Sequence, residues 1–154
     1  MHLRGATLHD LPAASDLCLR SKAHWGYDLA FLEACREELI VTPQDLSEDQ
    51  LILSVQDDQI TGLAQVSCDQ ESCILERLFI DPNHMGQGIG RRLFDWSVTV
   101  ARYQGASELI VESDPQAEGF YRRMGCQPAG TAPSGSIPGR VLPRLTLAIS
   151  GAQD

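Results

Sequence analysis

The chain has 154 residues, of which 43% are hydrophobic and 21% are charged. This is enough for one folded domain, and the composition excludes a wholly disordered protein. The formal net charge of −9 excludes a general binder of nucleic-acid phosphates, which needs a basic surface. We expect a single domain over 1–154 without a membrane-spanning segment, because no stretch approaches the roughly 18 apolar residues that such a helix needs.

Five cysteines are spread along the chain without a Cys-x-x-Cys pair and without a histidine at zinc spacing. This pattern predicts free thiols, no metal site and a reducing compartment. The first residues lack the apolar core of a secretory signal, so we expect a cytoplasmic protein. The five are Cys18, Cys35, Cys68, Cys73 and Cys126.

The charge is unevenly distributed along the chain. The first 76 residues carry 14 acidic and 4 basic side chains, whereas the remaining residues carry 7 acidic and 8 basic ones. Eleven of the twelve basic residues are arginine, and Lys22 is the only lysine. The asymmetry indicates either two differently charged ligands or an acidic face that is simply solvated.

The first third of the chain has helical patterns after one short strand. Residues 3–7 are predicted to form the strand. Helices are predicted over 11–22 and 29–39, because apolar side chains recur there every three or four positions. The polar residues 42–49 are expected to form a loop.

The middle of the chain changes to the two-residue period that is typical of strands. A hairpin is predicted from residues 51–56 and 60–67, and another strand over 72–80. The strongest helical pattern then runs over 86–103.

The last third returns to strands. Residues 109–111 are all apolar, as in a strand covered on both faces, and a short helix is predicted at about 116–124. A strand should begin at Cys126, the Gly- and Pro-rich residues 130–143 should form a loop, and residues 144–149 the last strand. This order of elements predicts a mixed α/β domain.

The most informative segment is Ile80-Asp-Pro-Asn-His-Met-Gly-Gln-Gly-Ile-Gly-Arg-Arg92, in which a strand runs through a glycine-rich turn into the long helix. Glycines allow positive φ angles and close approach of a ligand. The unpaired N–H groups of the first helical turn favour an anion. The segment therefore predicts a site for a phosphate or pyrophosphate.

Two familiar phosphate motifs are excluded by spacing. A P-loop ends in Gly-Lys-Ser/Thr, but Gly90 is followed by two arginines. A dinucleotide fingerprint that starts from Gly86 and Gly88 needs its third glycine where Arg91 stands. A glycine-rich turn without a ligand stays as the alternative.

The segment from Ile74 to Leu93 resembles the acyl-coenzyme A motif of the GCN5-related N-acetyltransferases, Arg/Gln-x-x-Gly-x-Gly/Ala. The segment from Ala117 to Cys126 is similar to a second motif of this family, Ala-x-x-Phe-Tyr-x-x-x-Gly-Phe. The resemblance covers nearly the whole chain. It implies a central mixed, mostly antiparallel sheet flanked by helices, with the fourth and fifth strands splayed apart.

The resemblance implies that acetyl-CoA is the cosubstrate and that backbone groups bind it. The strand before the turn would pair with the pantetheine arm, and the amide near Leu78 would donate to the thioester oxygen. The turn would bind the pyrophosphate. The implied residues are Leu78, Phe79 and Ile80 for the arm and Gly86, Gln87, Gly88, Ile89, Gly90 and Arg91 for the pyrophosphate.

The chain departs from the family pattern at three places. Met85 stands at the Arg/Gln position, and Cys126 stands where the second motif ends in phenylalanine. An asparagine that is frequent before the tyrosine helix is absent, and the residues there are Asp114-Pro115-Gln116.

Acetyl transfer to an amine needs a general acid and a general base. Tyr121 matches the family tyrosine that protonates the departing thiolate, although it could also be a packed helix residue. Glu76 and Glu112 stand where relatives carry the base, and we rank Glu76 first. Glu76 should share a strand face with Leu78 if alternation holds, and Glu112 follows three apolar residues that could desolvate it. Each could instead be a surface carboxylate.

The resemblance places the acceptor pocket at the first two helices and a late loop between strands. Trp25 and Tyr27 could contact an amine by cation–π interaction, or could simply pin a helix corner. Arg140, in the Gly- and Pro-rich loop, could meet an acceptor carboxylate or have no role in the site.

We therefore expect an N-acetyltransferase that transfers the acetyl group of acetyl-CoA directly to a small-molecule or peptide amine. The alternatives are a catalytically silent coenzyme A-binding domain and an acyltransferase that uses a longer acyl group. No nucleic-acid or membrane partner is expected, and the resemblance allows a homodimer.

Overall fold

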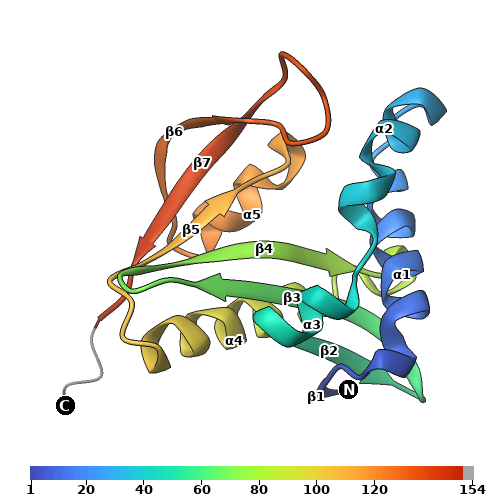
Figure 1. Cartoon of the computed structure of the whole chain (residues 1–154), viewed down its shortest axis with the longest axis horizontal. Helices are drawn as coiled ribbons and strands as arrows, with labels where there is room; N and C mark the ends of the chain where they lie inside the picture. The colour runs from blue at the N-terminus through green and yellow to red at the C-terminus, as the bar shows by residue number, and fades with distance from the viewer. Residues whose placement is uncertain (151–154) are drawn as a thin grey trace.

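The computed structural model describes residues 1–150, so the last four residues of the predicted domain lie outside the described part. Seven strands form one sheet in the order β1-β2-β3-β4-β5-β7-β6 (Figure 1). Only the β4–β5 pair is parallel. The strands are β1 (His2–Gly5), β2 (Gln50–Gln56), β3 (Gln59–Cys68), β4 (Ser72–Ile80), β5 (Glu108–Glu112), β6 (Gln127–Pro133) and β7 (Val141–Ala148).

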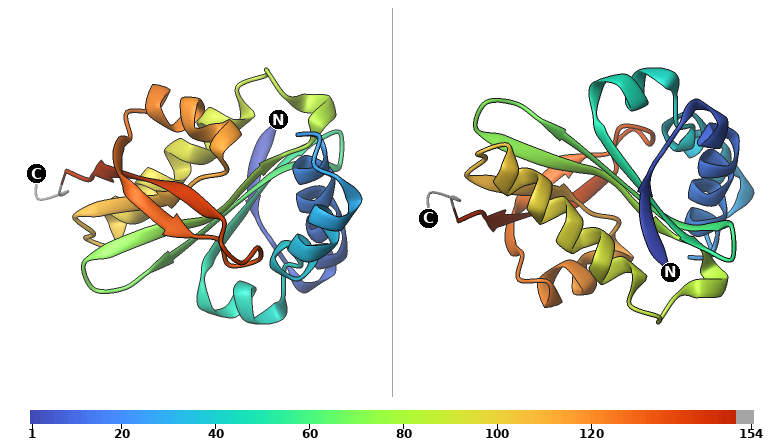
Figure 2. Two further views of the ribbon diagram at one scale, coloured as in Figure 1. Left: turned by 90° about the horizontal axis from the view of Figure 1, so that it is seen from above. Right: turned by 90° about the horizontal axis from the view of Figure 1, so that it is seen from below.

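Helices cover both faces of the sheet (Figure 2). The helices α1 to α3 lie on one face, and α4 and α5 lie on the other. None of the helices in the described residues is long and apolar enough to cross a membrane. The helices are η1 (Leu8–Asp10), α1 (Leu11–Ala23), α2 (Leu29–Leu39), α3 (Pro43–Glu48), η2 (Pro82–His84), α4 (Ile89–Tyr103), η3 (Pro115–Ala117) and α5 (Glu118–Arg123).

Each face of the sheet has its own apolar core. On one face, the predicted stripe of α1, including Leu17 and Cys18, packs against Leu53 and Leu63. On the other face, α4 buries Leu93 and its neighbours against β3, β4 and β5. The two cores hold the sheet rigidly from both sides, so the strand ends that form the site have fixed positions.

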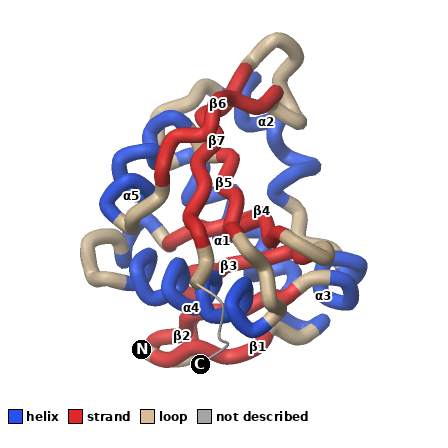
Figure 3. Tube along the Cα trace, turned by 90° about the vertical axis from the view of Figure 1, so that its left-hand side faces the viewer, coloured by secondary structure: helices blue, strands red, loops and turns tan. Residues whose placement is uncertain are grey.

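The sheet opens between β4 and β5, as the resemblance implied. Parallel pairing begins at Ser72 and Glu108 and ends at Leu75 and Val111. Beyond that point β4 continues to Ile80 with β3 as its partner, and β5, β7 and β6 run at a steep angle to β3 and β4 (Figure 3). The outer edge of β4 is therefore free of strand partners along its second half.

A bulge in β4 changes the predicted orientation of Glu76. Gln65 of β3 lies opposite Arg77 and Val66 lies opposite Leu75, so Glu76 has no partner in the register. Its carboxylate accepts a hydrogen bond from Ser67 of β3 (2.6 Å). Ser67 lies on the face opposite to Val66, whereas Leu78 packs in the α4 core. The expectation that Glu76 and Leu78 share a face was wrong, because a bulge interrupts alternation.

Two predicted loops are partly regular structure. Residues 42–49 contain α3, which begins with a capping box in which Thr42 and Asp45 each accept the other's backbone N–H. The expected loop 130–143 shrinks to residues 134–140, because β6 and β7 extend into it from both sides. Several prolines and Gly130, which has a φ of +90°, are typical of loops, so the sequence pattern did not indicate these strands.

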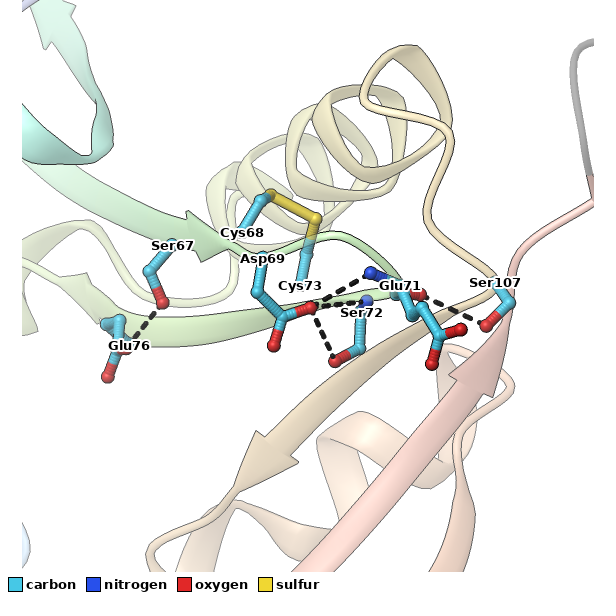
Figure 4. Close-up of a disulfide and its surroundings, with 8 residues drawn as sticks. All are labelled: Ser67, Cys68, Asp69, Glu71, Ser72, Cys73, Glu76 and Ser107. Carbon is cyan, nitrogen blue, oxygen red and sulfur yellow. Dashed lines mark hydrogen bonds between the residues drawn. A yellow bond between two sulfur atoms is a disulfide. The ribbon is translucent and has the colours of Figure 1, made fainter.

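The prediction of five free thiols was wrong for two cysteines. Cys68 and Cys73 lie directly opposite one another at the end of the β3–β4 hairpin and form a disulfide (Figure 4). Asp69 stabilises the turn between them by accepting the backbone N–H groups of Glu71 and Ser72, each at 3.0 Å. Cys18, Cys35 and Cys126 are free and buried, as expected for the other three.

Thiol counting tests the disulfide. In denaturant, three thiols should react with a chromogenic disulfide reagent before reduction and five after it. The variant Cys68→Ser should unfold about 2 kcal/mol more easily, because closing a loop this short removes about that much chain entropy from the unfolded state. Reductant should lower the stability of the parent protein but not of the variant. Five reactive thiols before reduction would contradict the assignment.

Candidate active site

A cavity of about 930 Å³ lies where β4 and β5 separate, a volume typical of small-molecule sites. Its walls come from α1, α2 and α3 on one side and from the glycine turn, α4 and α5 on the other. Twelve of the fifteen predicted site residues line it, whereas Gln87, Tyr27 and Arg140 are absent from its wall. The wall includes Tyr121, Glu76, Glu112, Leu78, Phe79, Ile80, Gly86, Gly88, Ile89, Gly90, Arg91 and Trp25.

The glycine turn leaves backbone donors free at the start of α4. Gly86 and Gly88 have φ angles of +79° and +82°, which glycine adopts readily and other residues do not. The N–H of Arg92 donates to the carbonyl of Gly88 at 3.2 Å, so the N–H groups of the three residues between them precede the first helical acceptor. These donors and the helix dipole form a site suited to a phosphate group.

Two arginines add positive charge to this end of the cavity. Arg91 lines it, as predicted, and so does Arg123 of α5, which the sequence analysis did not single out. Arg92, which the sequence places next to Arg91, instead contacts the sulfur of Met1 at 3.6 Å. Arg123 stands at a variable position of the second family motif, so nothing in the sequence marked it.

The free edge of β4 leads from the glycine turn towards the centre of the cavity. Leu78, Phe79 and Ile80 pair with Ala64, Leu63 and Gly62 of β3 on one side, and all three line the cavity. Backbone groups in a strand point alternately to its two edges. An extended ligand can therefore add to β4 as a further strand would.

Tyr121 lies on α5 at the wall of the cavity and is 7% exposed. Its ring packs against Phe94 and Phe120, and among the described residues none forms a hydrogen bond with its hydroxyl. Burial, followed by the nearby Cys126 and Asp114, raises the pKa of the phenol above its ordinary value. The group therefore stays protonated at neutral pH, as a proton donor must.

The two candidate bases flank the point at which the sheet opens. Leu75 and Val111 form the last pair between β4 and β5, and Glu76 and Glu112 are the next residues of their strands. Both line the cavity and both are exposed. The expected desolvation of Glu112 is therefore absent. Ser67 holds the carboxylate of Glu76 in place (Figure 4).

The residues predicted at the acceptor end differ in what they contact. Trp25 is partly exposed and lines the cavity. Tyr27 donates a hydrogen bond to Asp114 at 2.7 Å and accepts one from Arg140 at 3.1 Å. Its ring lies near two cations of the protein itself, Lys22 and Arg140. Tyr27 and Arg140 thus lie next to each other, as members of a cluster around Asp114. Neither lines the cavity, where an amine would bind.

Asp114 is the centre of this cluster and was noted in the sequence only as a departure from the family pattern. Lys22 donates to its Oδ2 at 2.8 Å, and both side chains are largely buried. Burial opposes ionisation of Asp114, but the hydrogen bonds from Lys22 and Tyr27 outweigh it, so its pKa lies below the ordinary value. The carboxylate is therefore ionised at neutral pH.

A second polar network, which was not predicted, is centred on Arg77, directly after the bulge of β4. Arg77 donates to Gln65, to Asp45 of α3 and to the carbonyl groups of Glu38 and Ile40. This network anchors the α2–α3 connection to the sheet. Two adjacent charged residues, Glu76 and Arg77, in a mostly apolar strand were the signal in the sequence.

Within residues 1–150, histidine, cysteine, aspartate and glutamate side chains form no group of three or more that could hold a metal ion.

Comparison with known proteins agrees with the geometry. The family model described as "Acetyltransferase (GNAT) domain" matches residues 14–132. The peptidyl-lysine N-acetyltransferase YjaB of Salmonella typhimurium is 37% identical over 73 residues, which is 47% of this chain and 48% of the relative. The matched part thus spans about half the length of this curated relative.

Solved structures share the fold over nearly the whole chain. The GCN5-related N-acetyltransferase from Rhodopseudomonas palustris has a TM-score of 0.81 at 19% identity and covers 96% of this chain and 94% of its own. The PaiA N-acetyltransferase from Thermoplasma acidophilum, solved in complex with coenzyme A, has a TM-score of 0.75 at 15% identity. The match covers 96% of this chain and 98% of the PaiA chain. At these low sequence identities the structural similarity shows a shared fold and no more.

Proposed function

The chain belongs to the GNAT acetyltransferase family, and on that premise we propose that it transfers an acetyl group from acetyl-CoA directly to an amine. One observation carries the proposal. A single cavity joins the free N–H groups of the glycine turn, the free edge of β4, the buried phenol of Tyr121 and the two carboxylates, Glu76 and Glu112, at the opening of the sheet.

The residues fit coenzyme A at two places. The turn offers backbone donors and Arg91 to a pyrophosphate, and the edge of β4 offers peptide groups to an extended amide-containing arm. When bound, acetyl-CoA supplies an acetyl group activated as a thioester. Backbone donors on β4 near Leu78 polarise the carbonyl that the amine attacks.

Proton transfer is assigned to side chains on opposite walls. The amine must lose a proton to attack, and Glu76 accepts it, with Glu112 as the alternative. The thiolate that departs must gain a proton, and Tyr121 donates it. As the amide forms, the nitrogen loses a second proton, which restores the phenol of Tyr121, and Glu76 returns its own proton to solvent. The net products from an ammonium acceptor are an amide, a free thiol and one released proton.

We propose a cationic primary amine as the acceptor, on a small molecule or a peptide. Glu76, Glu112 and Asp49 line the cavity and attract a cation to its acceptor end. The Salmonella relative is named as a peptidyl-lysine N-acetyltransferase, which makes a lysine side chain in a peptide the first acceptor to test.

The test is release of free coenzyme A over a panel of amines that includes lysine peptides, diamines and amino acids. Acetyl-CoA is compared with longer acyl-CoA esters. Turnover with acetyl-CoA and an amine supports the proposal. Binding of coenzyme A without turnover on any amine would favour the silent binding domain, and faster turnover with a longer ester would favour the other alternative.

Glutamine variants separate the two candidate bases. Glu76→Gln should lower kcat/KM at neutral pH by about a hundredfold, because it removes the proton acceptor, whereas Glu112→Gln should have a much smaller effect. Glu108→Gln, on the same strand as Glu112 but away from the cavity wall, is the matched control. A larger loss in Glu112→Gln would transfer the role to Glu112.

We also propose that the protein works in the cytoplasm. The three free buried thiols support this location, whereas the Cys68–Cys73 disulfide is typical of oxidising compartments. Counting thiols in protein from cells whose thiols were blocked before lysis decides between them. A blocked Cys68 and Cys73 would mean that the disulfide forms only after lysis and would support the cytoplasm, whereas an unblocked pair would contradict it.

A further inference from the structure

Three regions that are far apart in the sequence meet at the carboxylate of Asp114: the α1–α2 region, the segment after β5 that carries Asp114, and the β6–β7 connection. Lys22 comes from the end of α1, Tyr27 from the turn before α2, and Arg140 from the connection between β6 and β7. The distances from Oδ2 of Asp114 are 2.8 Å to the ammonium of Lys22, 2.7 Å to the hydroxyl of Tyr27 and 3.9 Å to the guanidinium of Arg140. One side chain thus joins both walls of the cavity.

The two oxygens of Asp114 have different partners. Oδ2 receives the donors from the α1–α2 side, whereas Oδ1 accepts the backbone N–H of Gln116 at 3.0 Å. Gln116 belongs to η3, which passes directly into α5, the helix that carries Tyr121. The carboxylate therefore caps the segment that positions Tyr121 and simultaneously binds the opposite wall.

The cations of the cluster have little freedom to move. The rings of Tyr27 and Phe31 stack at a centroid distance of 4.0 Å. The ammonium of Lys22 lies 5.2 Å from the Tyr27 ring, and the guanidinium of Arg140 lies 4.8 Å from the Phe31 ring. Lys22 and Asp114 have side-chain exposures of 15% and 14%. A partly buried pair with several partners is held more firmly than a surface ion pair.

The cluster also acts on Tyr121 electrostatically. The negative charge of Asp114 is one of the causes that raise the pKa of the Tyr121 phenol, after burial. Removal of that charge would make the phenol easier to ionise and would leave Lys22 without its anionic partner. The carboxylate that caps η3 thus also contributes, after burial and Cys126, to the raised pKa of Tyr121.

From this geometry we propose that Asp114 is a positioning residue, which aligns Tyr121 on α5 with the opposite wall of the cavity through its contacts with Lys22, Tyr27 and Arg140. The inference rests on the proposed function, in which Tyr121 is the general acid. Asp114 itself acts through Tyr121 and needs no contact with the reacting atoms.

A double-mutant cycle with Tyr121→Phe tests the inference. Asp114→Asn should lower kcat at least tenfold, change KM for the amine less than kcat, and leave the Kd of coenzyme A within about twofold. In the Tyr121→Phe background, Asp114→Asn should cause little further loss, because coupled residues are not additive. Equal losses in both backgrounds, or unchanged kcat in Asp114→Asn, would overturn the inference.

Milder variants test the inference even if Asp114→Asn fails to fold. Tyr27→Phe removes one hydrogen bond to Asp114 and keeps the stacked ring, so it should lower kcat less but show the same dependence on Tyr121. Lys22→Arg should keep most of the activity, whereas Lys22→Met should not. Arg4→Met is the control, because it breaks a bidentate pair with Asp10 away from the cavity and should leave kcat unchanged. Loss of kcat in Arg4→Met equal to that in Lys22→Met would count against a specific role.

Hydrogen exchange gives a readout that does not depend on turnover. Without any ligand, Asp114→Asn should exchange the backbone amides of η3 and α5 faster than the parent protein, while those of the central part of α4 stay protected. Unchanged exchange in α5 would overturn the inference. If the parent protein acetylates no amine, the proposed function fails. If Tyr121→Phe is fully active, only the role of Tyr121 as general acid fails. In both cases the exchange result still reports on the coupling between Asp114 and α5.

Discussion

Replacing Tyr121 by phenylalanine should lower kcat by about a hundredfold to ten-thousandfold, the range over which general acids contribute. The change removes one oxygen atom from a residue in the apolar core. Because the hydroxyl has no hydrogen-bond partner among the described residues, the ring should keep its packing against Phe94 and Phe120. Stability and the Kd of coenzyme A should therefore be nearly unchanged.

Steady-state kinetics, calorimetric titration with coenzyme A and thermal unfolding measure these three quantities. Tyr103→Phe is a matched control, since Tyr103 is 88% exposed at the end of α4 and lies away from the cavity wall. If Tyr121→Phe keeps the kcat of the parent protein, the proton for the thiolate comes from elsewhere and Tyr121 is only a core residue.

The second large effect concerns the glycine turn. Gly90→Asp should weaken binding of coenzyme A about a hundredfold relative to Gly90→Asn, because a carboxylate about 5 Å from a phosphate repels it by about 3 kcal/mol at an intermediate dielectric constant. Aspartate in the first turn also suits the dipole of α4, so the helix should persist.

The comparison with asparagine separates charge from size. A Cβ atom at position 90 would lie 3.3 Å from the ring of Phe120, so both variants require the same small movement there. Titration with coenzyme A at low and high salt is the measurement, and the difference between the variants should shrink as salt screens the repulsion. Equal affinities at low salt would show that no phosphate binds at this turn.

The sequence predicted the glycine turn, the long helix and the tyrosine helix because their signals are local. A left-handed backbone at Gly86 and Gly88 and an apolar stripe along α4 depend on residues that are near one another in the chain. The same holds for the strands β2 to β4, whose bounds differ from the prediction by one residue at most.

The features that could not be predicted from the sequence depend on contacts between distant residues or on strand register. The bulge at Glu76 has no local signal, yet it reverses the face on which the carboxylate lies. Cys68 and Cys73 became a pair because the hairpin places them opposite one another. The Asp114 cluster joins residues up to 113 positions apart, which no spacing rule could connect.

The opening of the sheet also affects which strands are exposed to other protein molecules. An unpaired edge invites strand addition and aggregation, and this sheet has three such edges. The two outer ones are poor templates: β1 has four residues, and β6 contains Pro128, Pro133 and an irregular register. The third, along the second half of β4, begins at the bulge and lies inside the cavity. The edge of β4 that is proposed to bind the cosubstrate is thus the edge that a strand of another protein molecule can reach least easily.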